Sequence, residues 1–429
     1  MTSTVSPVSA APTGTGAPAT ASTGLSVAQG SALTIGAVLG TGVLALPAVA
    51  ATVAGPASLV AWLGLVLLSI PLSATFAALG ARFPDGGGVS TFARQAFGAK
   101  ASAAVGWCFY FAIPVGAPPA ASFAGFYVAD SLGGGRTSEL LTAAGLIVVV
   151  TAMNWFGIRI SGGVQLLIAG VLATMLAVAT LVSLPHADLG NLTPFAPHGW
   201  GSVGAAAALL VWAFAGWEAV SSLSGDYRNP GRDVPRATMV ALVVVATLYL
   251  GIAFATVTVL GPNPGSAPLS DLLVLGFGEV ARPVTTLAAV MLSLGAINAY
   301  FAGGARLGAA LGRDGALPEW LAHGSAAGQV PRRSLLVVAG MSLTTLAVVG
   351  VSGAPLAATI LVVTGAFTLV YVVGTAAAVK VLPRGTWVHR GAVVSFIATL
   401  ALLWMTGLQV VSAVVVAALA VLWSSRKGR

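Results

Sequence analysis

The stretch from Ile35 to Pro47 has the sequence Ile-Gly-Ala-Val-Leu-Gly-Thr-Gly-Val-Leu-Ala-Leu-Pro and lies in an apolar segment of about residues 29–54. Two glycines, Gly40 and Gly42, stand near its middle, and each weakens a helix by about 1 kcal/mol relative to alanine. Unwound backbone at membrane depth persists only where it lines a cavity in the protein. We therefore expect a membrane helix that is interrupted at Gly40, Thr41 and Gly42. A glycine-rich face for close helix packing is the alternative interpretation.

The composition supports a membrane location for most of the chain. Of its 429 residues, 57% are hydrophobic and only 7% are charged, whereas about a quarter of the residues in soluble domains are charged. Neither a soluble fold nor a disordered chain has this balance. The apolar runs are long and continuous rather than alternating, which favours helices over a membrane β-barrel. The predicted fold class is therefore an all-α integral membrane protein.

Twelve apolar segments follow a low-complexity tail. Residues 1–24 are mostly Ser, Thr, Ala, Pro and Gly, so we expect this N-terminal tail to be disordered. A membrane-spanning helix needs about 20 residues. The twelve expected transmembrane helices lie at about residues 29–54, 57–81, 101–131, 137–156, 160–184, 201–224, 236–261, 281–307, 334–352, 355–381, 391–407 and 409–424.

The sixth segment contains a second interruption. Its centre has the sequence Trp212-Ala-Phe-Ala-Gly-Trp-Glu218, in which Gly216 precedes a carboxyl group by two residues. Interruptions in the first and sixth segments fit a five-helix unit that is repeated with inverted topology, since five is an odd number. Paired interruptions of this kind indicate a transporter substrate site, and freed amide groups at a helix end suit a carboxylate.

Glu218 is the only acidic residue that we place deep within a predicted span. Ionisable groups at that depth are costly to desolvate and usually functional. We therefore predict that Glu218 acts in gating or proton coupling. The alternative is a structural carboxyl group that bonds to helix backbone.

Two further spans hold candidates for the cavity wall. Residues 113–120 contain three prolines, the first of them Pro114, and we expect them to disrupt the helix. This distortion, with Gly116, either shapes the cavity or only fits the helix bundle. Asn298, the only asparagine deep in a late span, either lines the cavity or bonds to another helix.

The distribution of basic residues predicts the orientation. All of the 19 Lys and Arg residues except Arg136 and Arg282 fall in one alternate set of connecting segments. The positive-inside rule places this set in the cytoplasm, and both termini with it. The net charge of +8 is thus a topology signal and does not indicate a nucleic-acid partner. The single cysteine, Cys108, provides neither a disulfide framework nor a Cys-based metal site, and we expect no metal and no cofactor.

Several motifs in order resemble the amino acid–polyamine–organocation transporter superfamily. They are Leu39-Gly-Thr-Gly-Val43 with Pro47, the Pro84…Gly87-Gly88 loop, Phe214-Ala-Gly-Trp-Glu218, Asn229-Pro-Gly-Arg-Asp-Val-Pro-Arg236 and Arg306…Arg313-Asp-Gly-Ala-Leu-Pro318. Two more pieces, Ile113-Pro-Val-Gly-Ala-Pro118 and Ala28-Gln-Gly30, look most like the bacterial L-methionine and branched-chain amino acid exporters.

This resemblance implies a 5+5 inverted-repeat core of the leucine-transporter type. The first repeat would occupy residues 25–184, the second residues 201–381, and two peripheral helices residues 391–424. The matching substrate-binding positions are Gly40, Thr41, Gly42, Phe214, Ala215 and Gly216, and Glu218 matches a gating carboxylate. One departure is that residues 165–184 contain no lysine, although some members of the superfamily couple protons through a lysine in this span.

A secondary active transporter is the function that these patterns favour. A membrane enzyme would need clustered His, Asp or Glu, whereas the four histidines are dispersed in loops, and a channel would need rings of polar residues. No Arg or Lys lies in the middle of a span, and Trp212, Phe214 and Trp217 provide an apolar wall. We therefore expect a neutral amino acid as the substrate.

The resemblance makes this expectation more specific. It implies efflux of L-methionine and branched-chain amino acids across the bacterial cell membrane by alternating access, with H+ as the coupling ion. Apart from the substrate, the ion and the lipid bilayer, we expect no other partner. The alternative is a proton-coupled uptake permease or exchanger for other amino acids or amines.

Overall fold

The computed structural model describes residues 24–83, 88–158, 162–218, 227–324 and 329–427, so most of the predicted N-terminal tail lies outside the described residues. The secondary structure of the described part is helical, apart from one parallel β-bridge between Leu25 and Tyr227.

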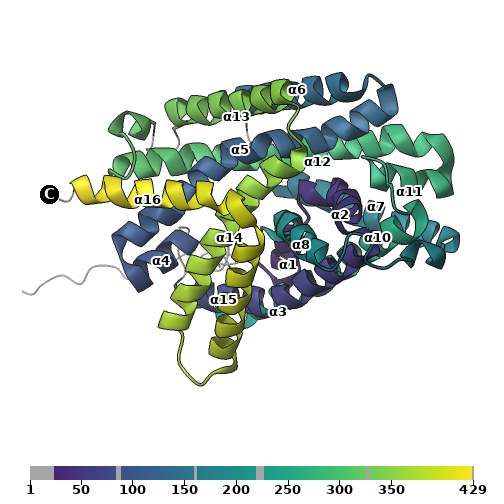
Figure 1. Cartoon of the computed structure of the whole chain (residues 1–429). Helices are drawn as coiled ribbons and strands as arrows, with labels where there is room; N and C mark the ends of the chain where they lie inside the picture. The colour runs from purple at the N-terminus through teal and green to yellow at the C-terminus, as the bar shows by residue number, and fades with distance from the viewer. Residues whose placement is uncertain (1–23, 84–87, 159–161, 219–226, 325–328, 428–429) are drawn as a thin grey trace, which may run out of the picture.

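Figure 1 shows the arrangement of the helices. The α-helices are α1 (Val27–Val38), α2 (Leu46–Ala54), α3 (Ser58–Arg82), α4 (Val89–Phe97), α5 (Ala99–Leu132), α6 (Gly135–Trp155), α7 (Gly162–Ser183), α8 (Gly201–Phe214), α10 (Pro230–Leu260), α11 (Pro268–Phe277), α12 (Ala281–Arg313), α13 (Arg332–Ser352), α14 (Leu356–Val381), α15 (Trp387–Met405) and α16 (Val410–Lys427). The short 3-10 helices are η1 (Thr41–Leu44), η2 (Gly55–Ala57), η3 (Leu184–His186), η4 (Leu189–Leu192), η6 (Gly278–Val280), η7 (Glu319–Ala322) and η8 (Gly407–Gln409).

Ten helical stretches in the described part of the chain are long and apolar enough to cross a membrane. One of them, Leu46–Arg82, includes both α2 and α3, and another, Pro268–Arg313, includes α11 and α12. Two apolar helices are shorter, because α1 has 12 residues and α8 has 14. The structure therefore supports an all-helical, multi-pass membrane protein. The arrangement of twelve spans in two inverted repeats stays a prediction.

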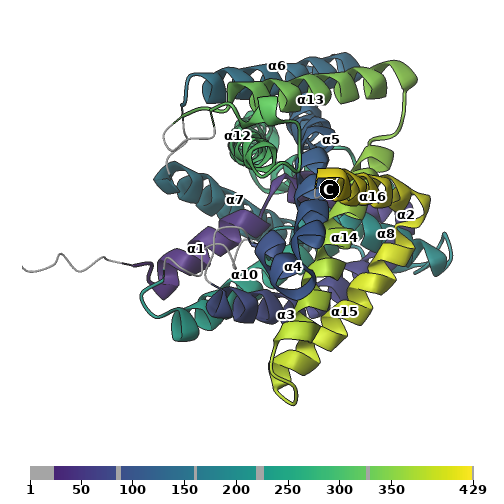
Figure 2. The same cartoon turned by 90° about the vertical axis from the view of Figure 1, so that its left-hand side faces the viewer.

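The longest helix of the described chain, α5, connects the outer helices with those around the two interruptions. It packs against α4, α6, α12, α13, α14 and α16. Helices α6 and α13 lie side by side along one edge of the molecule in both views (Figures 1 and 2). On the other side of α5, α1 packs against α10 and α8 packs against α3. Both interrupted segments thus lie inside the bundle.

Two helices were not expected from the sequence. One is α4, in which Val89, Phe92, Ala93 and Ala96 are buried on a single face. The other is α11, a helix of 10 residues that lies between two predicted spans. Both are too short for a search that looks for about 20 apolar residues. Helix α4 is amphipathic, whereas α11 is mostly apolar on all sides, and each connecting helix packs buried side chains against neighbouring spans.

The prolines of α5 do not interrupt this helix, contrary to our expectation. Residues 99–132 form one helix that contains Pro114, Pro118 and Pro119. Each proline removes one N–H donor, whereas unwinding would expose several backbone groups in an apolar environment, which costs more. The sequence around the prolines is rich in Gly and Ala, so neighbouring helices can pack closely here.

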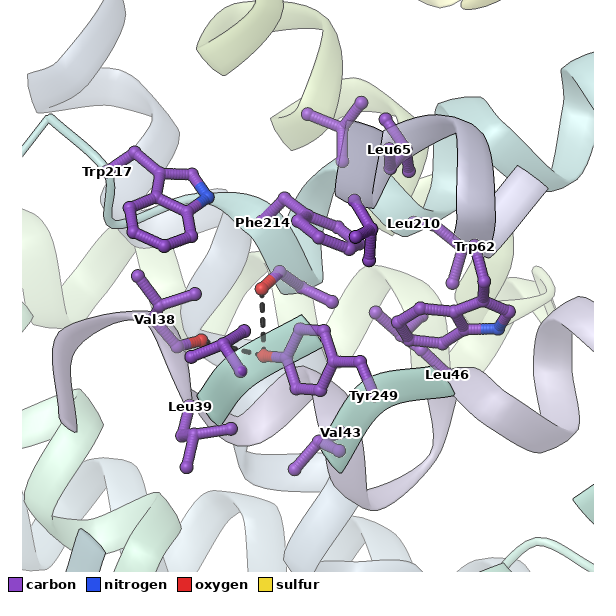
Figure 3. Packing of buried hydrophobic residues seen from close by; sticks show 14 of the residues in the cluster. Val38, Leu39, Val43, Leu46, Trp62, Leu65, Leu210, Phe214, Trp217 and Tyr249 are labelled. Atoms are coloured by element: carbon purple, nitrogen blue, oxygen red, sulfur yellow. Dashed lines mark hydrogen bonds between the residues drawn. The ribbon is translucent and has the colours of Figure 1, made fainter. Parts of the chain in front are cut away.

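A buried tyrosine joins the two interrupted segments. The hydroxyl oxygen of Tyr249, on α10, lies 2.8 Å from the carbonyl oxygen of Val38 and 2.9 Å from that of Ala213, and it shares its single proton between them (Figure 3). Around it, the rings of Trp62 and Phe214 lie edge-on or tilted to the tyrosine ring. Both carbonyl groups belong to helix ends that no longer continue the α-helical ladder. Tyr249 therefore gives the carbonyl group of Ala213 a side-chain donor, and it adds a second donor to that of Val38, which also accepts from the amide of Gly40.

We predict that Tyr249→Phe lowers the free energy of unfolding by about 1–3 kcal/mol, because the buried carbonyl group of Ala213 loses its side-chain donor and that of Val38 keeps only the amide of Gly40. Thr247→Val is the matched control. Thr247 is an exposed residue on the same helix, and its hydroxyl group donates to the carbonyl oxygen of Val243, one turn earlier in that helix. Thermal unfolding of the purified protein in detergent measures both effects. Equal unfolding temperatures for Tyr249→Phe and the unsubstituted protein would contradict the role of this hydroxyl group.

Candidate substrate site

A cavity of about 390 Å³ lies where the two interrupted segments meet. Gly40 and Thr41 line it from the first segment, and Ala215, Gly216 and Glu218 line it from the second. Helices α5, α7, α12 and α14 supply the remaining wall. The volume falls within the range of about 300–1,000 Å³ that is usual for small-molecule sites. The structure thus brings most of the predicted site residues of both segments to one cavity.

The first interruption leaves backbone groups outside the helical ladder. Helix α1 ends at Val38, and the amide of Gly40 donates to the carbonyl oxygen of Val38 at 2.7 Å. Gly40 itself is extended, with φ −77° and ψ −171°, before the tight turn of η1 begins at Thr41. Gly40 and Thr41, at this point of the chain, line the cavity.

The second interruption requires a glycine. Helix α8 ends at Phe214, Ala215 is extended, and Gly216 has a φ of 125°. A Cβ atom at position 216 would lie 2.7 Å from the carbonyl oxygen of Ala37, at the end of α1. Only glycine allows this conformation and this close approach of two backbones. The contact between the two interrupted segments is therefore specified by one residue.

Glu218 accepts hydrogen bonds from both of its neighbouring segments at the edge of the cavity. Its Oε2 atom accepts from the backbone amide of Gly216 at 2.9 Å and from the hydroxyl group of Tyr371 on α14. The bond from Gly216 is the kind that a structural carboxyl group would make. Glu218 is only partly buried and also lines the cavity, which keeps it within reach of a ligand or a proton.

The rest of the cavity wall is largely apolar. It includes Trp212, Ile113 and Phe367, which come from three different helices. Gly116 also lines the cavity, and a Cβ atom there would lie 3.3 Å from the indole ring of Trp212. This wall suits an uncharged, mainly apolar side chain.

Two polar residues of the wall were not predicted from the sequence. They are Tyr300 on α12 and Gln165 on α7, and the side chains of both are exposed. Tyr371, which donates to Glu218, was also missed. A hydroxyl or amide group within an otherwise apolar span is the signal that would have found them.

Other predicted residues lie beside the cavity rather than on its surface. Phe214 packs against Trp62, and Trp217 is fully buried in the apolar core, as Figure 3 shows. The amide of Asn154 on α6 donates to the Oδ1 atom of Asn298 at 2.8 Å, so Asn298 bonds to another helix. Pro114 is buried within α5. The roles proposed for these residues remain predictions.

Gly42 also lies outside the cavity surface. A Cβ atom there would lie 2.7 Å from the ring of Trp212 and 2.9 Å from the side chain of Leu46. Gly42 therefore allows the cavity-lining Trp212 to pack directly on the first interruption.

The described residues contain no group of three or more His, Cys, Asp or Glu side chains that could hold a metal ion. The polar residues that line the cavity are instead Thr41, Gln165, Glu218 and Tyr300, which carry hydroxyl, amide and carboxyl groups. Such groups bind a small polar molecule with an apolar part, and they lie inside a membrane-spanning bundle between two broken helices. These features define a multi-pass membrane transporter.

Comparison with known proteins identifies the family. A sequence model described as amino acid permease matches residues 25–425, and the chain belongs to this family. It is 34% identical over 372 residues to the uncharacterized amino acid permease YecA of Bacillus subtilis, covering 86% of this chain and 88% of that protein. It is 32% identical over 368 residues to the L-methionine/branched-chain amino acid exporter YjeH of Escherichia coli, covering 83% and 86%. It is also 29% identical over 247 residues to the branched-chain amino acid permease BcaP of B. subtilis, covering 52% and 51%. The family and these relatives are transporters rather than enzymes, which confirms the predicted class.

The two glycines of the first interruption give a matched pair of variants. We predict that Gly42→Ala lowers stability by about 1–3 kcal/mol, because the added methyl group overpacks against Trp212 and Leu46. Gly40→Ala is expected to leave stability nearly unchanged, since its Cβ atom would meet no atom closer than 3.9 Å. Thermal unfolding of both variants tests this difference. Similar unfolding temperatures for the two variants would contradict the prediction, because they would show that a methyl group at position 42 fits without loss of stability.

Proposed function

We propose that this permease is a secondary active transporter of neutral amino acids, with L-methionine, leucine, isoleucine and valine as its substrates. The observation that carries this proposal is the 390 Å³ cavity between two helix interruptions. In this proposal, peptide groups at Gly40, Thr41 and Ala215 bind the amino and carboxylate groups of the substrate. The apolar wall, with Trp212, receives its side chain.

The charge of the site supports a neutral substrate. Among the described residues that line the cavity, Glu218 is the only one that is an Asp, Glu, Lys, Arg or His. A side chain with an unpaired charge would pay a desolvation cost in this wall. Aliphatic side chains that differ by one methylene group are separated by only about 1–3 kcal/mol. We therefore expect overlapping recognition of the four substrates.

The helix lengths support an architecture of twelve spans. In this proposal, α1 with α2 forms the first span and α8 begins the sixth, so that each short helix is half of a broken span. The inverted repeats occupy residues 25–184 and 201–381, and α15 and α16 are peripheral. Phe214, Trp217, Pro114 and Asn298 then support the site from behind the residues that contact the substrate.

The distribution of basic residues supports the orientation in the membrane, and the similarity to named transporters supports the direction of transport. The distribution of basic residues favours cytoplasmic termini in a bacterial cell membrane. The cavity lining extends to Leu33 of α1 and Gln165 of α7, so this orientation makes the conformation inward-facing. Similarity to an exporter of L-methionine and branched-chain amino acids favours efflux. The similarity to the permease BcaP favours uptake as the second candidate.

Coupling to H+ is proposed for Glu218. Its carboxyl group lies between the second interruption and Tyr371 of α14. A movement of α14 relative to α8 would change the hydrogen bonds of the carboxylate and therefore its affinity for a proton. Such a difference in affinity between two conformations is what allows an ion gradient to bias transport.

Flux measurements in liposomes test the substrate class. We expect the purified protein to exchange radiolabelled methionine, leucine, isoleucine and valine. Arginine and glutamate should be transported at least about tenfold more slowly, because the wall offers no cation to glutamate and offers arginine only Glu218, which is already bonded to Gly216 and Tyr371. Protein-free liposomes are the control. Faster exchange of arginine than of methionine would reject the proposed site.

The Glu218→Gln variant tests proton coupling. Glutamine keeps the shape of the side chain and has no titratable proton, so we expect net transport to lose its pH dependence while some substrate exchange remains. Glu319→Gln is the matched control, because Glu319 is exposed on η7, remote from the cavity lining. Liposome flux between about pH 5 and 8 measures the effect. Identical pH profiles for Glu218→Gln and the unsubstituted protein would leave only the structural role, whereas a complete loss of substrate binding would indicate a direct contact.

A further inference from the structure

A cluster of charged residues joins three helices at the face where α5 ends and α12 begins. The Nη1 atom of Arg282 on α12 donates to Asp130 of α5 at 2.7 Å and to Asp271 of α11 at 3.3 Å. Its Nε atom donates to Glu279 at 2.7 Å. The hydroxyl group of Ser270, also on α11, donates to Asp130 at 3.3 Å. These five residues are called the Arg282 cluster below.

One cation in this cluster faces three carboxylates. The side chains of Arg282, Asp130 and Asp271 are only about one quarter exposed, whereas that of Glu279 is 77% exposed. The two bonds to the aspartates are therefore less screened by solvent than the bond to Glu279. Without the guanidinium group, Asp130 and Asp271 would repel each other. Arg282 thus holds α11 against α5, and its loss would turn this attraction into repulsion.

The same helix is bonded to the first interruption. The backbone amide of Leu269, in the first turn of α11, donates to the hydroxyl group of Tyr127 at 3.3 Å. That hydroxyl group donates to the carbonyl oxygen of Leu44 at 2.7 Å. Leu44 ends η1, which begins at the cavity-lining residue Thr41. Tyr127 therefore connects α11 by hydrogen bonds to the segment that lines the substrate cavity.

Packed side chains close the cavity toward this face. The lining residue of α5 nearest to the cluster is Ala120, and the corresponding residue of α12 is Leu292. Between them and the cluster, Phe123 and Tyr127 have no exposed surface, and Leu272 of α11 is also fully buried. Access from this side requires that α11 move away.

We propose that Arg282 is a gating residue that keeps the cavity closed on the α11 side and releases α11 when the transporter opens to that side. Its carboxylate partners, Asp130 and Asp271, are the positions at which the closed state is held. The proposal rests on alternating access, as proposed above, and goes beyond it by assigning the closing interaction to one side chain. Arg282 acts on helix position and does not touch the substrate cavity.

Accessibility of a single cysteine from each side of the membrane tests the proposal. The reporter is Ala120→Cys in a Cys108→Ser background, which removes the single native cysteine. A membrane-impermeant thiol reagent is applied to right-side-out and to inside-out vesicles. We expect Arg282→Gln to raise the labelling rate from the α11 side by roughly tenfold, which corresponds to about 1.4 kcal/mol in the equilibrium between closed and open states. Asp271→Asn weakens the hold on α11 but keeps the bonds from Arg282 and Ser270 to Asp130, so its increase should be smaller.

Arg136→Gln is the matched control. Arg136 is the other basic residue on the predicted extracellular side, and it donates to the backbone carbonyl of Val349 at 3.1 Å. Its removal changes the charge of that face without touching α11, so labelling should stay unchanged. An equal increase in Arg136→Gln, or no increase in either Arg282→Gln or Asp271→Asn, would overturn the proposal. A lower unfolding temperature without faster labelling would indicate a purely structural ion pair.

The labelling assay needs neither substrate nor ion gradient. Faster labelling of Arg282→Gln in a protein that does not exchange methionine would therefore reject the proposed substrate and retain the gate. Methionine exchange together with unchanged labelling would reject the gate and retain the substrate.

Discussion

Hydrogen bonding of backbone at membrane depth is the constraint on which the rest of this structure depends. A helix that breaks inside the bundle leaves peptide groups that lipid cannot satisfy. In this chain, hydroxyl groups of buried tyrosines meet that requirement. Tyr249 donates to the ends of both α1 and α8, and Tyr127 donates to Leu44 beyond the first interruption. The breaks can persist because their backbone is bonded by side chains from helices that remain continuous.

The same bonds explain why the cavity lies at this depth. The hydroxyl groups of Tyr249 and Tyr127 donate to carbonyl groups on the core side of the breaks, while Gly40, Thr41 and Ala215 line the cavity on the other side. Gly216 brings the two segments into contact through a conformation that other residues rarely adopt. The core side of the two interruptions is therefore stabilised by tyrosine hydroxyl groups, and the cavity side is the side on which a ligand binds. A ligand that forms hydrogen bonds on the cavity side would stabilise the same two interruptions as the tyrosines do.

The sequence predicted the positions of both interruptions because glycine acts locally, through the intrinsic cost of placing it in a helix. It also predicted that Gly40, Thr41, Ala215, Gly216 and Glu218 would gather at one site. It did not predict that Ala215 lines the cavity whereas Phe214 does not. The position of Phe214 depends on its packing against Trp62 and Tyr249, which come from distant parts of the chain. The continuous helix through Pro114 was missed for a similar reason, since the cost of a lost hydrogen bond was considered without the larger cost of unwinding. Helices α4 and α11 were missed because each depends on tertiary packing rather than on length.

The missed helix α11 changes how the charged residues of the chain are interpreted. From the sequence, Arg282 is one of two basic residues that depart from the distribution of positive charge, and such a residue carries only a topological meaning. The structure places it among three carboxylates, on α5, α11 and η6, and hydrogen bonds connect α11 through Tyr127 to the first interruption. The scarcity of charge then becomes informative. In a chain with only 7% charged residues, four of them meet where a short helix covers the end of the bundle. Because these ion pairs are partly solvated, each contributes modestly, and the free energy needed to break them is small.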